Sequence, residues 1–209
     1  MTLRTRVKIC GLTSREDALL AVNAGADAIG LVFYEPSPRH VEIDQACKIA
    51  QSIPAFVTKT ALFVNPEKAY VQQVLDTVAI DLLQFHGDET AEFCQQFGRP
   101  YIKAVRMQES TDLELLAKEF VSSCGLLLDA YVAGKPGGTG EKFNWEWIPK
   151  ESDLPIILAG GLTSLNVKQA IQVASPWAVD VSGGVEASKG IKSSEKIKQF
   201  MQQVMSTVE

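Results

Sequence analysis

The chain has 209 residues, of which 46% are hydrophobic and 22% charged, a length that suits one compact domain or two small ones. Its net charge of −5 argues against the basic surface of a nucleic-acid-binding protein. It starts without the apolar run of a signal peptide, and no stretch approaches the ~18 apolar residues of a membrane span. We therefore expect a cytoplasmic protein with no nucleic-acid or membrane partner.

Four cysteines stand far apart and form no CxxC pair: Cys10, Cys47, Cys94 and Cys124. This spacing predicts reduced thiols rather than a zinc ribbon or a disulfide framework. The two histidines are too few for a multi-histidine metal centre, and without a GxSxG motif a Ser-His-Asp triad is poorly supported. The P-loop and GxGxxG patterns of nucleotide-binding proteins are missing as well.

Short β-rich runs alternate with helical stretches along the chain. Eight such runs can be counted, at residues 7–10, 28–33, 60–64, 82–86, 102–106, 125–129, 155–159 and 178–182. Apolar residues spaced i, i+3, i+4, i+7 predict helices around 167–174 and 197–205. The segment 14–17 has the spacing of a capping box, and Thr163 or Ser164 is expected to cap the helix that follows.

This alternation predicts an α/β fold with a parallel sheet. We expect a single (β/α)8 TIM barrel over residues 1–209, since eight units of about 26 residues lie near the compact end for this fold. A doubly wound open sheet is the alternative. It is disfavoured because the chain shows no obvious reversal of strand order and no second-domain shift in composition.

Two reactive side chains lie where predicted strands end, and in a barrel the chemistry sits at the carboxyl ends of the strands. Cys10 shares the inward phase of Lys8, so it should point into the mouth, where cations would lower its pKa toward that of a thiolate base. Asp129 ends the run Gly-Leu-Leu-Leu-Asp, and a partly buried carboxyl suits general acid catalysis. A core cysteine and a loop cap are the structural alternatives. The glycine-rich loop 134–140 is interpreted as a lid.

Two glycine-containing loops follow the last two predicted strands, Gly160-Gly161 and Ser182-Gly183-Gly184. Backbone N–H groups in such loops can approach an anion closely, and barrel enzymes commonly bind a substrate phosphate at these two positions. Residues 185–190 have the length for the short extra helical turn that often assists. The sequence therefore predicts a small phosphorylated substrate.

Some polar residues have structural interpretations. Lys8 and Asp180 take inward positions on the first and last predicted strands, which become neighbours only if the barrel closes, so we predict that they form an ion pair. Asn65 is expected to cap the helix that follows it. Arg106 is expected to pair with an acidic neighbour.

Eight ordered motifs resemble the phosphoribosylanthranilate isomerase family over nearly the whole chain. They are Val-Lys-Ile-Cys-Gly-Leu-Thr at 7–13, Ser-Pro-Arg-His-Val at 37–41, Leu-Phe-Val-Asn at 62–65, Gln-Phe-His-Gly-Asp at 84–88, Leu-Asp-Ala at 128–130, Gly-Gly-Thr-Gly at 137–140, Leu-Ala-Gly-Gly-Leu at 158–162 and Val-Asp-Val-Ser-Gly-Gly-Val-Glu at 179–186. The resemblance implies a barrel without metal or organic cofactor that performs an Amadori rearrangement in tryptophan biosynthesis.

The resemblance also implies roles for single residues. Cys10 would be the general base and Asp129 the general acid. Arg39 would contact the anthranilate end of a phosphorylated sugar-amine substrate, with His86 and Asp180 as further substrate-binding candidates. The phosphate would be bound by Gly160, Gly161, Ser182, Gly183 and Gly184.

One position departs from the family pattern. Many relatives have Ser-Ser-Gly where this chain has Ser182-Gly183-Gly184, so a hydroxyl contact at position 183 is lost while the backbone N–H remains. The sequence leaves the oligomeric state open between a monomer and a homodimer.

Other classes remain as alternatives. Barrel isomerases of the triose-phosphate or aminoimidazole-ribotide type also bind phosphate after strands seven and eight, but the histidine-pathway enzyme would have an aspartate in place of Cys10. A metal-dependent pentose-phosphate epimerase would need more histidines. A catalytically silent phosphosugar-binding barrel would keep the glycine loops and need neither Cys10 nor Asp129.

Overall fold

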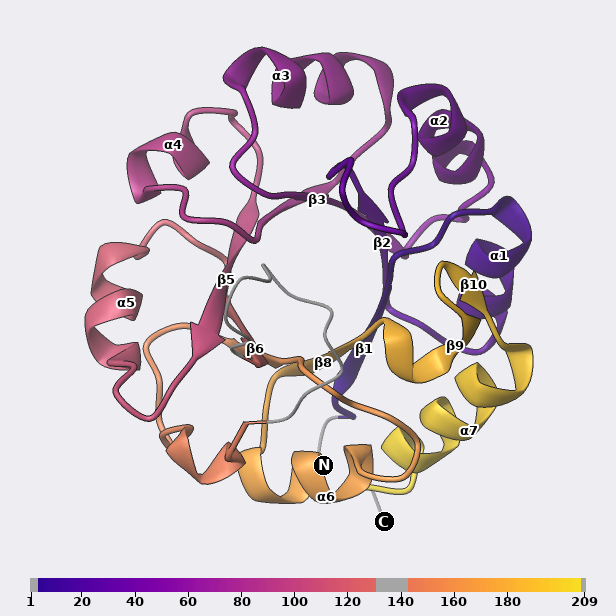
Figure 1. The fold of residues 1–209 in the computed structure, drawn as a ribbon. Helices are drawn as coiled ribbons and strands as arrows, with labels where there is room; N and C mark the ends of the chain where they lie inside the picture. The colour runs from indigo at the N-terminus through magenta and orange to yellow at the C-terminus, as the bar shows by residue number, and fades with distance from the viewer. Residues whose placement is uncertain (1–3, 131–142, 208–209) are drawn as a thin grey trace.

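Eight parallel strands close into a barrel in the computed structural model, which describes residues 4–130 and 143–207 (Figure 1). The strands are β1 (Arg6–Cys10), β2 (Ala28–Val32), β3 (Thr58–Phe63), β4 (Leu82–Phe85), β5 (Tyr101–Met107), β6 (Leu126–Ala130), β7 (Ile156–Leu158) and β8 (Ala178–Val181). They pair in chain order, and β8 closes on β1. The predicted barrel is confirmed and the open sheet is wrong, while strand boundaries differ from those predicted by no more than two residues.

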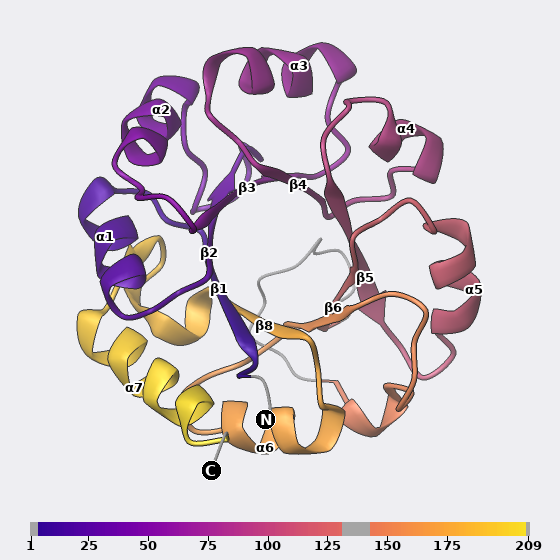
Figure 2. The same ribbon diagram turned by 180° about the vertical axis from the view of Figure 1, so that it is seen from behind.

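Helices surround the ring of strands, as the two opposite views show (Figures 1 and 2). They are α1 (Arg15–Asn23), α2 (Ile43–Gln51), α3 (Lys68–Thr77), α4 (Ala91–Gln95), α5 (Leu113–Glu119), α6 (Val167–Ala174) and α7 (Ser194–Met205). Between β6 and β7, the described residues 143–155 contain only the 3₁₀ helix η1 (Trp145–Trp147). The regular alternation of strand and helix is therefore incomplete in the described part of the sixth unit.

The helix starts test the predicted caps. The Ser14 hydroxyl accepts a hydrogen bond from the Asp17 backbone N–H at 3.0 Å, which confirms the cap of α1. Helix α6 begins after Asn166, so neither Thr163 nor Ser164 is its N-cap. That prediction is wrong because the Thr163 hydroxyl accepts a bond within the turn that precedes the helix.

The segment after β8 differs from the predicted helical turn at 185–190. A short 3₁₀ helix, η2 (Gly183–Val185), leads into an antiparallel hairpin of β9 (Glu186–Ser188) and β10 (Ile191–Lys192), which lies beside α1 and α7 (Figure 1). Gly190, with φ of +82°, supplies the backbone conformation that this tight turn needs. The hairpin turns the side chains of Glu186 and Lys192 inward, where both are buried.

The strands separate an outer core from the barrel interior. Outward side chains pack under the helices, whereas an inner apolar cluster fills the ring below the mouth with Ile102, Ala104, Leu127, Ile157, Ala159 and Ala178. Alternation along each strand places polar residues one step further toward the carboxyl ends, so Asp129 follows Leu127 on the inward face. The polar candidate site residues therefore lie on the carboxyl-terminal side of this inner apolar cluster.

A buried ion pair joins the first and last strands. Lys8 and Asp180 face each other in the β1–β8 register, with Lys8 Nζ 2.9 Å from Asp180 Oδ1. Burial alone would lower the pKa of Lys8, but Asp180 and Cys10 together outweigh it and the net pKa is raised, so the ammonium stays charged. The predicted pair is confirmed, and it exists only because the barrel closes.

Replacing Lys8 with methionine is expected to lower the free energy of unfolding by about 3–5 kcal/mol, because the Asp180 carboxylate would remain buried without a partner. Denaturant unfolding followed by circular dichroism measures this change. The matched control is Lys118→Met at the exposed Lys118–Glu114 pair, which should leave unfolding unchanged. The double variant Lys8→Met/Asp180→Leu should recover most of the loss, and a single variant as stable as the parent would contradict the assignment.

Candidate active site

Cys10 ends β1 and points into the barrel. Its side chain is 5% exposed and packs with Val32 and Leu62. A Cβ atom added at Gly30, on the next strand, would lie 2.6 Å from Cys10 Sγ and 3.0 Å from Lys8 Nζ. Gly30 thus leaves open the space in which the thiol and the ammonium approach each other, on the inward face that alternation predicts.

The pKa of Cys10 differs from the expectation. Burial raises the pKa of the thiol above its ordinary value of 9.0, and the Asp180 carboxylate adds to this rise. The Lys8 ammonium acts in the opposite direction without cancelling them. The predicted lowering is therefore wrong for the chain without substrate, because burial of the thiol outweighs the Lys8 ammonium, which is itself paired with Asp180.

Asp129 lies across the ring on β6, with 7% of its surface exposed. Its Oδ1 accepts a hydrogen bond from the Ala130 N–H at 2.8 Å, and its Oδ2 lies 3.2 Å from His86 Nε2. His86 Nδ1 lies in turn 3.0 Å from Gln84 Nε2. The inward phase of β4 places Gln84 and His86 on the same face, so His86, a predicted substrate-binding residue, contacts the candidate acid directly.

The two glycine-containing loops lie against Asp129 and against Gly11, the residue after Cys10. A Cβ at Gly160, where φ is +77°, would lie 2.7 Å from the Ala130 nitrogen and 3.0 Å from Asp129 Oδ1. A Cβ at Gly11, directly after the cysteine, would lie 2.9 Å from Ser182 Oγ. The carboxyl therefore adjoins the loop after β7, and Gly11, the residue after the thiol, adjoins the loop after β8.

The two glycine loops also touch each other. A Cβ at Gly184 would collide with the carbonyl oxygen of Leu162, so only glycine fits there without moving the loop after β7. Gly183 is exposed, and Gly160, Gly161 and Ser182 are partly exposed. The backbone at these positions thus forms a contiguous, accessible edge of the mouth.

Gly184→Ala is expected to cost about 1–3 kcal/mol of stability and to weaken binding of any anion at this edge, because the loop must shift. Gly183→Ala is the matched control, since its added methyl would lie 3.2 Å from a side-chain atom, Arg39 Nη2, whereas the methyl at Gly184 would collide with backbone. Thermal unfolding and titration with inorganic phosphate measure both effects. Equal changes in stability and in phosphate binding for the two variants would contradict the assigned collision at Gly184.

Arg39 reaches the same edge from the loop after β2. Its Nε and Nη2 donate to Glu186 at 2.6 and 2.8 Å, and Lys192 Nζ lies 3.0 Å from Glu186 and 3.1 Å from the Ser182 carbonyl oxygen. Burial would raise the pKa of Glu186, but the bonds from Arg39 and Lys192 hold it below its usual value. Two cations are thereby fixed beside the loop after β8.

Sequence reasoning missed the parts that Glu186 and Lys192 play. In the sequence, Glu186 stands only at the end of a motif, and Lys192 lies outside every motif. A buried charged pair across a two-residue strand has no periodic signal in the sequence. Only the hairpin brings the two side chains together.

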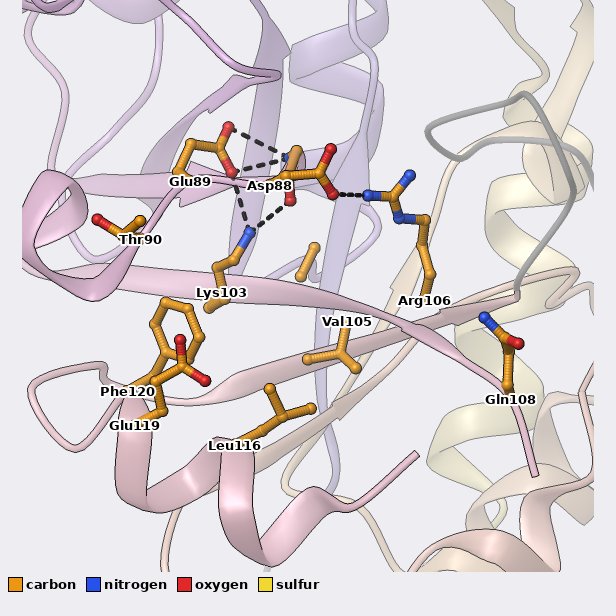
Figure 3. A pocket seen from close by; sticks show the side chains of 12 residues that line it. Asp88, Glu89, Thr90, Lys103, Val105, Arg106, Gln108, Leu116, Glu119 and Phe120 are labelled. Carbon is orange, nitrogen blue, oxygen red and sulfur yellow. Dashed lines mark hydrogen bonds and ion pairs between the residues drawn. The ribbon is translucent and has the colours of Figure 1, made fainter. Parts of the chain in front are cut away.

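A separate cavity of about 550 Å³ lies between the loop after β4, strand β5 and helix α5 (Figure 3). Lys103 lines this cavity and donates hydrogen bonds to Glu89 at 2.9 Å and to the Gly87 carbonyl oxygen at 2.6 Å. Arg106 pairs with Asp88, which confirms the predicted acidic partner (Figure 3). None of the predicted site residues lines this cavity, so it is distinct from the mouth.

Asn65 does not cap the helix that follows it. The N-cap of α3 is Glu67, whereas the Asn65 side chain accepts a hydrogen bond from the Asp88 N–H at 2.7 Å. Its φ of +46° turns the chain toward the neighbouring loop, which is why the predicted cap is wrong. Asn65 instead ties the loops after β3 and β4 together.

Two further features concern the described residues only. The predicted lid at 134–140 lies outside them. Within residues 4–130 and 143–207, no three His, Cys, Asp or Glu side chains gather as a possible metal site, and no helix is long and apolar enough to cross a membrane.

A thiol, a carboxyl and two glycine loops at one rim define the class of the protein, a (β/α)8-barrel enzyme with its polar groups at the carboxyl ends of the strands. A family model described as N-(5'-phosphoribosyl)anthranilate isomerase matches residues 7–203. The chain belongs to this family.

Individual relatives agree over almost the whole chain. The N-(5'-phosphoribosyl)anthranilate isomerase of Nitrosococcus oceani is 56% identical over 202 residues, which cover 97% of this chain and 98% of the relative. The solved phosphoribosyl anthranilate isomerase of Thermotoga maritima is 37% identical with a TM-score of 0.89, covering 97% and 99% of the two chains. A further solved structure, 36% identical with a TM-score of 0.86 and the same coverage, holds reduced 1-(o-carboxyphenylamino)-1-deoxyribulose 5-phosphate.

Proposed function

We propose that this chain converts N-(5-phosphoribosyl)anthranilate into 1-(o-carboxyphenylamino)-1-deoxyribulose 5-phosphate by an Amadori rearrangement in tryptophan biosynthesis. Family membership and the 56% identical relative support this proposal. The observation that carries it is the position of Cys10 and Asp129 at the carboxyl ends of different strands of one barrel. The Asp129 carboxyl adjoins the loop after β7, and Gly11, directly after Cys10, adjoins the loop after β8.

The reaction needs one proton donor and one proton acceptor. Asp129 would protonate the ribose ring oxygen as the C1–O bond breaks, and the nitrogen lone pair would form a Schiff base at C1. The Cys10 thiolate would then remove the proton from sugar C2, giving an enolamine that tautomerises to the ketone. Each such transfer typically contributes about 10²- to 10⁴-fold to the rate.

The glycine loops would bind the substrate phosphate. The backbone N–H groups of Gly160, Gly161, Ser182, Gly183 and Gly184 are the proposed donors. Lys192 adds a fixed positive charge beside Ser182. At Gly183 the contact would come from the backbone alone, in place of the hydroxyl found in many relatives.

The anthranilate end would lie near Arg39. Because Nε and Nη2 of Arg39 already donate to Glu186, its Nη1 group is the one directed to the substrate carboxylate. Asp180 would act through Lys8, whose ammonium lies between it and the thiol. His86 would act at the acid, through its contact with Asp129.

The test is a fluorescence assay of the purified chain with freshly made phosphoribosylanthranilate. Enzyme-dependent loss of anthranilate-type fluorescence beyond the spontaneous rate is the expected result. A chain that binds the substrate and does not change this rate would instead be a silent phosphosugar-binding barrel. Activity only on an aminoimidazole-ribotide substrate would identify the histidine-pathway type and overturn the proposal.

The pKa direction of Cys10 gives a second expected result. Because the pKa is raised above 9.0, alkylation by iodoacetamide should accelerate with pH without levelling off by pH 9. The measurement uses a Cys47→Ser/Cys124→Ser background, and Cys94, whose pKa is raised to about 12, remains slow. Cys10→Ser in that background gives the blank, and a rate that levels off near pH 7 would contradict a raised pKa.

We also propose a domain organisation, a location and an oligomeric state for the enzyme. We take residues 1–209 as one catalytic domain that acts in the cytoplasm without metal or organic cofactor and without nucleic-acid or membrane partners. It would act as a monomer or a homodimer, and a Thermotoga maritima relative is described as dimeric. Sedimentation would decide the oligomeric state, and unchanged turnover after chelator treatment is expected.

A further inference from the structure

Gln84 has no role in the proposed reaction, although it is fully buried inside the barrel on β4. We infer that Gln84 is a positioning residue: through His86 it keeps a neutral imidazole with its proton on Nε2, so that Asp129 can carry the proton it donates. The inference rests on the proposed function of Asp129, and one of its readouts is independent of activity.

Three side chains form a line across the interior. Gln84 Nε2 lies 3.0 Å from His86 Nδ1, and His86 Nε2 lies 3.2 Å from Asp129 Oδ2. His86 and Asp129 are 8% and 7% exposed. The imidazole therefore has one neighbour on each nitrogen, and water has little access to either contact.

The orientation of the Gln84 amide, with its Nε2 toward the ring, assigns the tautomer. An amide NH₂ group can only donate, so His86 Nδ1 must accept and carries no proton. The single proton of the neutral ring then sits on Nε2 and points to the Asp129 carboxyl oxygen. A second proton on Nδ1 would face the N–H of the Gln84 amide, which opposes formation of the imidazolium.

The carbonyl oxygen of the Gln84 amide indicates that this residue does more than stabilise the fold. Within the described residues, Gln84 Oε1 is buried and has no hydrogen-bond partner. A buried carbonyl without a partner destabilises the folded chain. The only hydrogen bond of the Gln84 side chain there is the one to His86, so the amide is placed where it controls the imidazole.

The protonation state of His86 affects Asp129, the proposed acid. An imidazolium 3.2 Å from Asp129 would favour the ionised carboxylate, which has no proton to give. A neutral Nε2–H ring orients the carboxyl without adding a full positive charge. The Gln84 amide thereby opposes an imidazolium–carboxylate pair at the proposed acid.

The first test needs no substitution at Gln84. The chain has two histidines, so ¹⁵N-histidine labelling gives two pairs of ring resonances, and His40→Asn assigns those of His86. The expected signature near neutral pH is a neutral ring with an Nε2 of pyrrole type and an Nδ1 of pyridine type. An Nδ1–H tautomer or an imidazolium in the parent protein would overturn the inference.

The second test compares two variants of similar shape. Gln84→Glu replaces the donor by acceptors and should move the proton to Nδ1 or produce the imidazolium, with kcat lowered about 10- to 100-fold and KM little changed. Gln84→Met removes the bond and should give mixed tautomers with a smaller loss. Gln169→Glu, on the exposed face of α6, is the matched control and should change neither signal nor rate.

The outcomes separate the two proposals. If Asp129→Asn abolishes turnover while Gln84→Glu alters neither the ring signals nor kcat, the inference fails and the proposed function stands. If Asp129→Asn leaves turnover intact, the proposed role of the acid fails, whatever the tautomer of His86. If the Gln84 variants do not fold, the ring resonances of the parent protein still decide.

Discussion

Replacing Cys10 with serine is expected to lower kcat by about 10²- to 10⁴-fold while KM changes little. Serine keeps the size of the side chain, but its hydroxyl is a far weaker acid than a thiol and gives almost no anion near neutral pH. The C2 proton of the sugar would then have no strong base within reach. Steady-state fluorescence assays with freshly made substrate measure both constants.

The matched control for this variant is Cys124→Ser. Cys124 is exposed and lies outside the mouth, so its replacement should leave kcat and KM at parental values. Thermal unfolding should show that Cys10→Ser remains folded, because the substitution leaves the buried Lys8–Asp180 ion pair in place. Near-normal turnover of Cys10→Ser would refute the thiolate as the base.

Asp129→Asn is the second replacement with a large expected effect, again about 10²- to 10⁴-fold in kcat with little change in KM. Asparagine is nearly the same shape and can still accept the hydrogen bond from the Ala130 N–H, but its amide is not an acid. Ring opening would then proceed without protonation of the ring oxygen. The loss should be largest in single-turnover measurements, which isolate the chemical steps.

Asp153→Asn provides the control, because Asp153 is exposed and lies in the loop before β7. Parental kinetics are expected for it. A large rise in KM for Asp129→Asn with kcat unchanged would show that the carboxyl binds substrate rather than donating a proton.

The fold was predictable because the alternation of strand and helix patterns and the predicted Lys8–Asp180 contact both indicate a closed barrel. Inward alternation in the first and last predicted strands places Lys8 opposite Asp180, and a charge at either position needs a partner once it is buried. The boundaries were less predictable, since a strand ends where its neighbour stops pairing. The hairpin at residues 186–192 was missed because tertiary ion pairs, not local propensity, hold it.

The candidate site was predictable in position and less so in electrostatics. Strand ends alone indicate that Cys10 and Asp129 share a rim, since all parallel strands end on the same side. The predicted direction of the Cys10 pKa was wrong, because a sequence shows that Lys8 is near without showing how deeply the thiol is buried, and burial is the largest influence on this pKa. The contact from Gln84 to His86 needs side-chain coordinates.

The most direct test of the arrangement is a crystal structure of this chain with reduced 1-(o-carboxyphenylamino)-1-deoxyribulose 5-phosphate, the ligand present in a relative. The account predicts the phosphate on the backbone N–H groups of the loops after β7 and β8, with the sugar carbons between Cys10 Sγ and the Asp129 carboxyl, about 3–3.5 Å from each. Binding in the outer cavity beside Lys103, or a pose in which either group cannot reach the sugar, would contradict it.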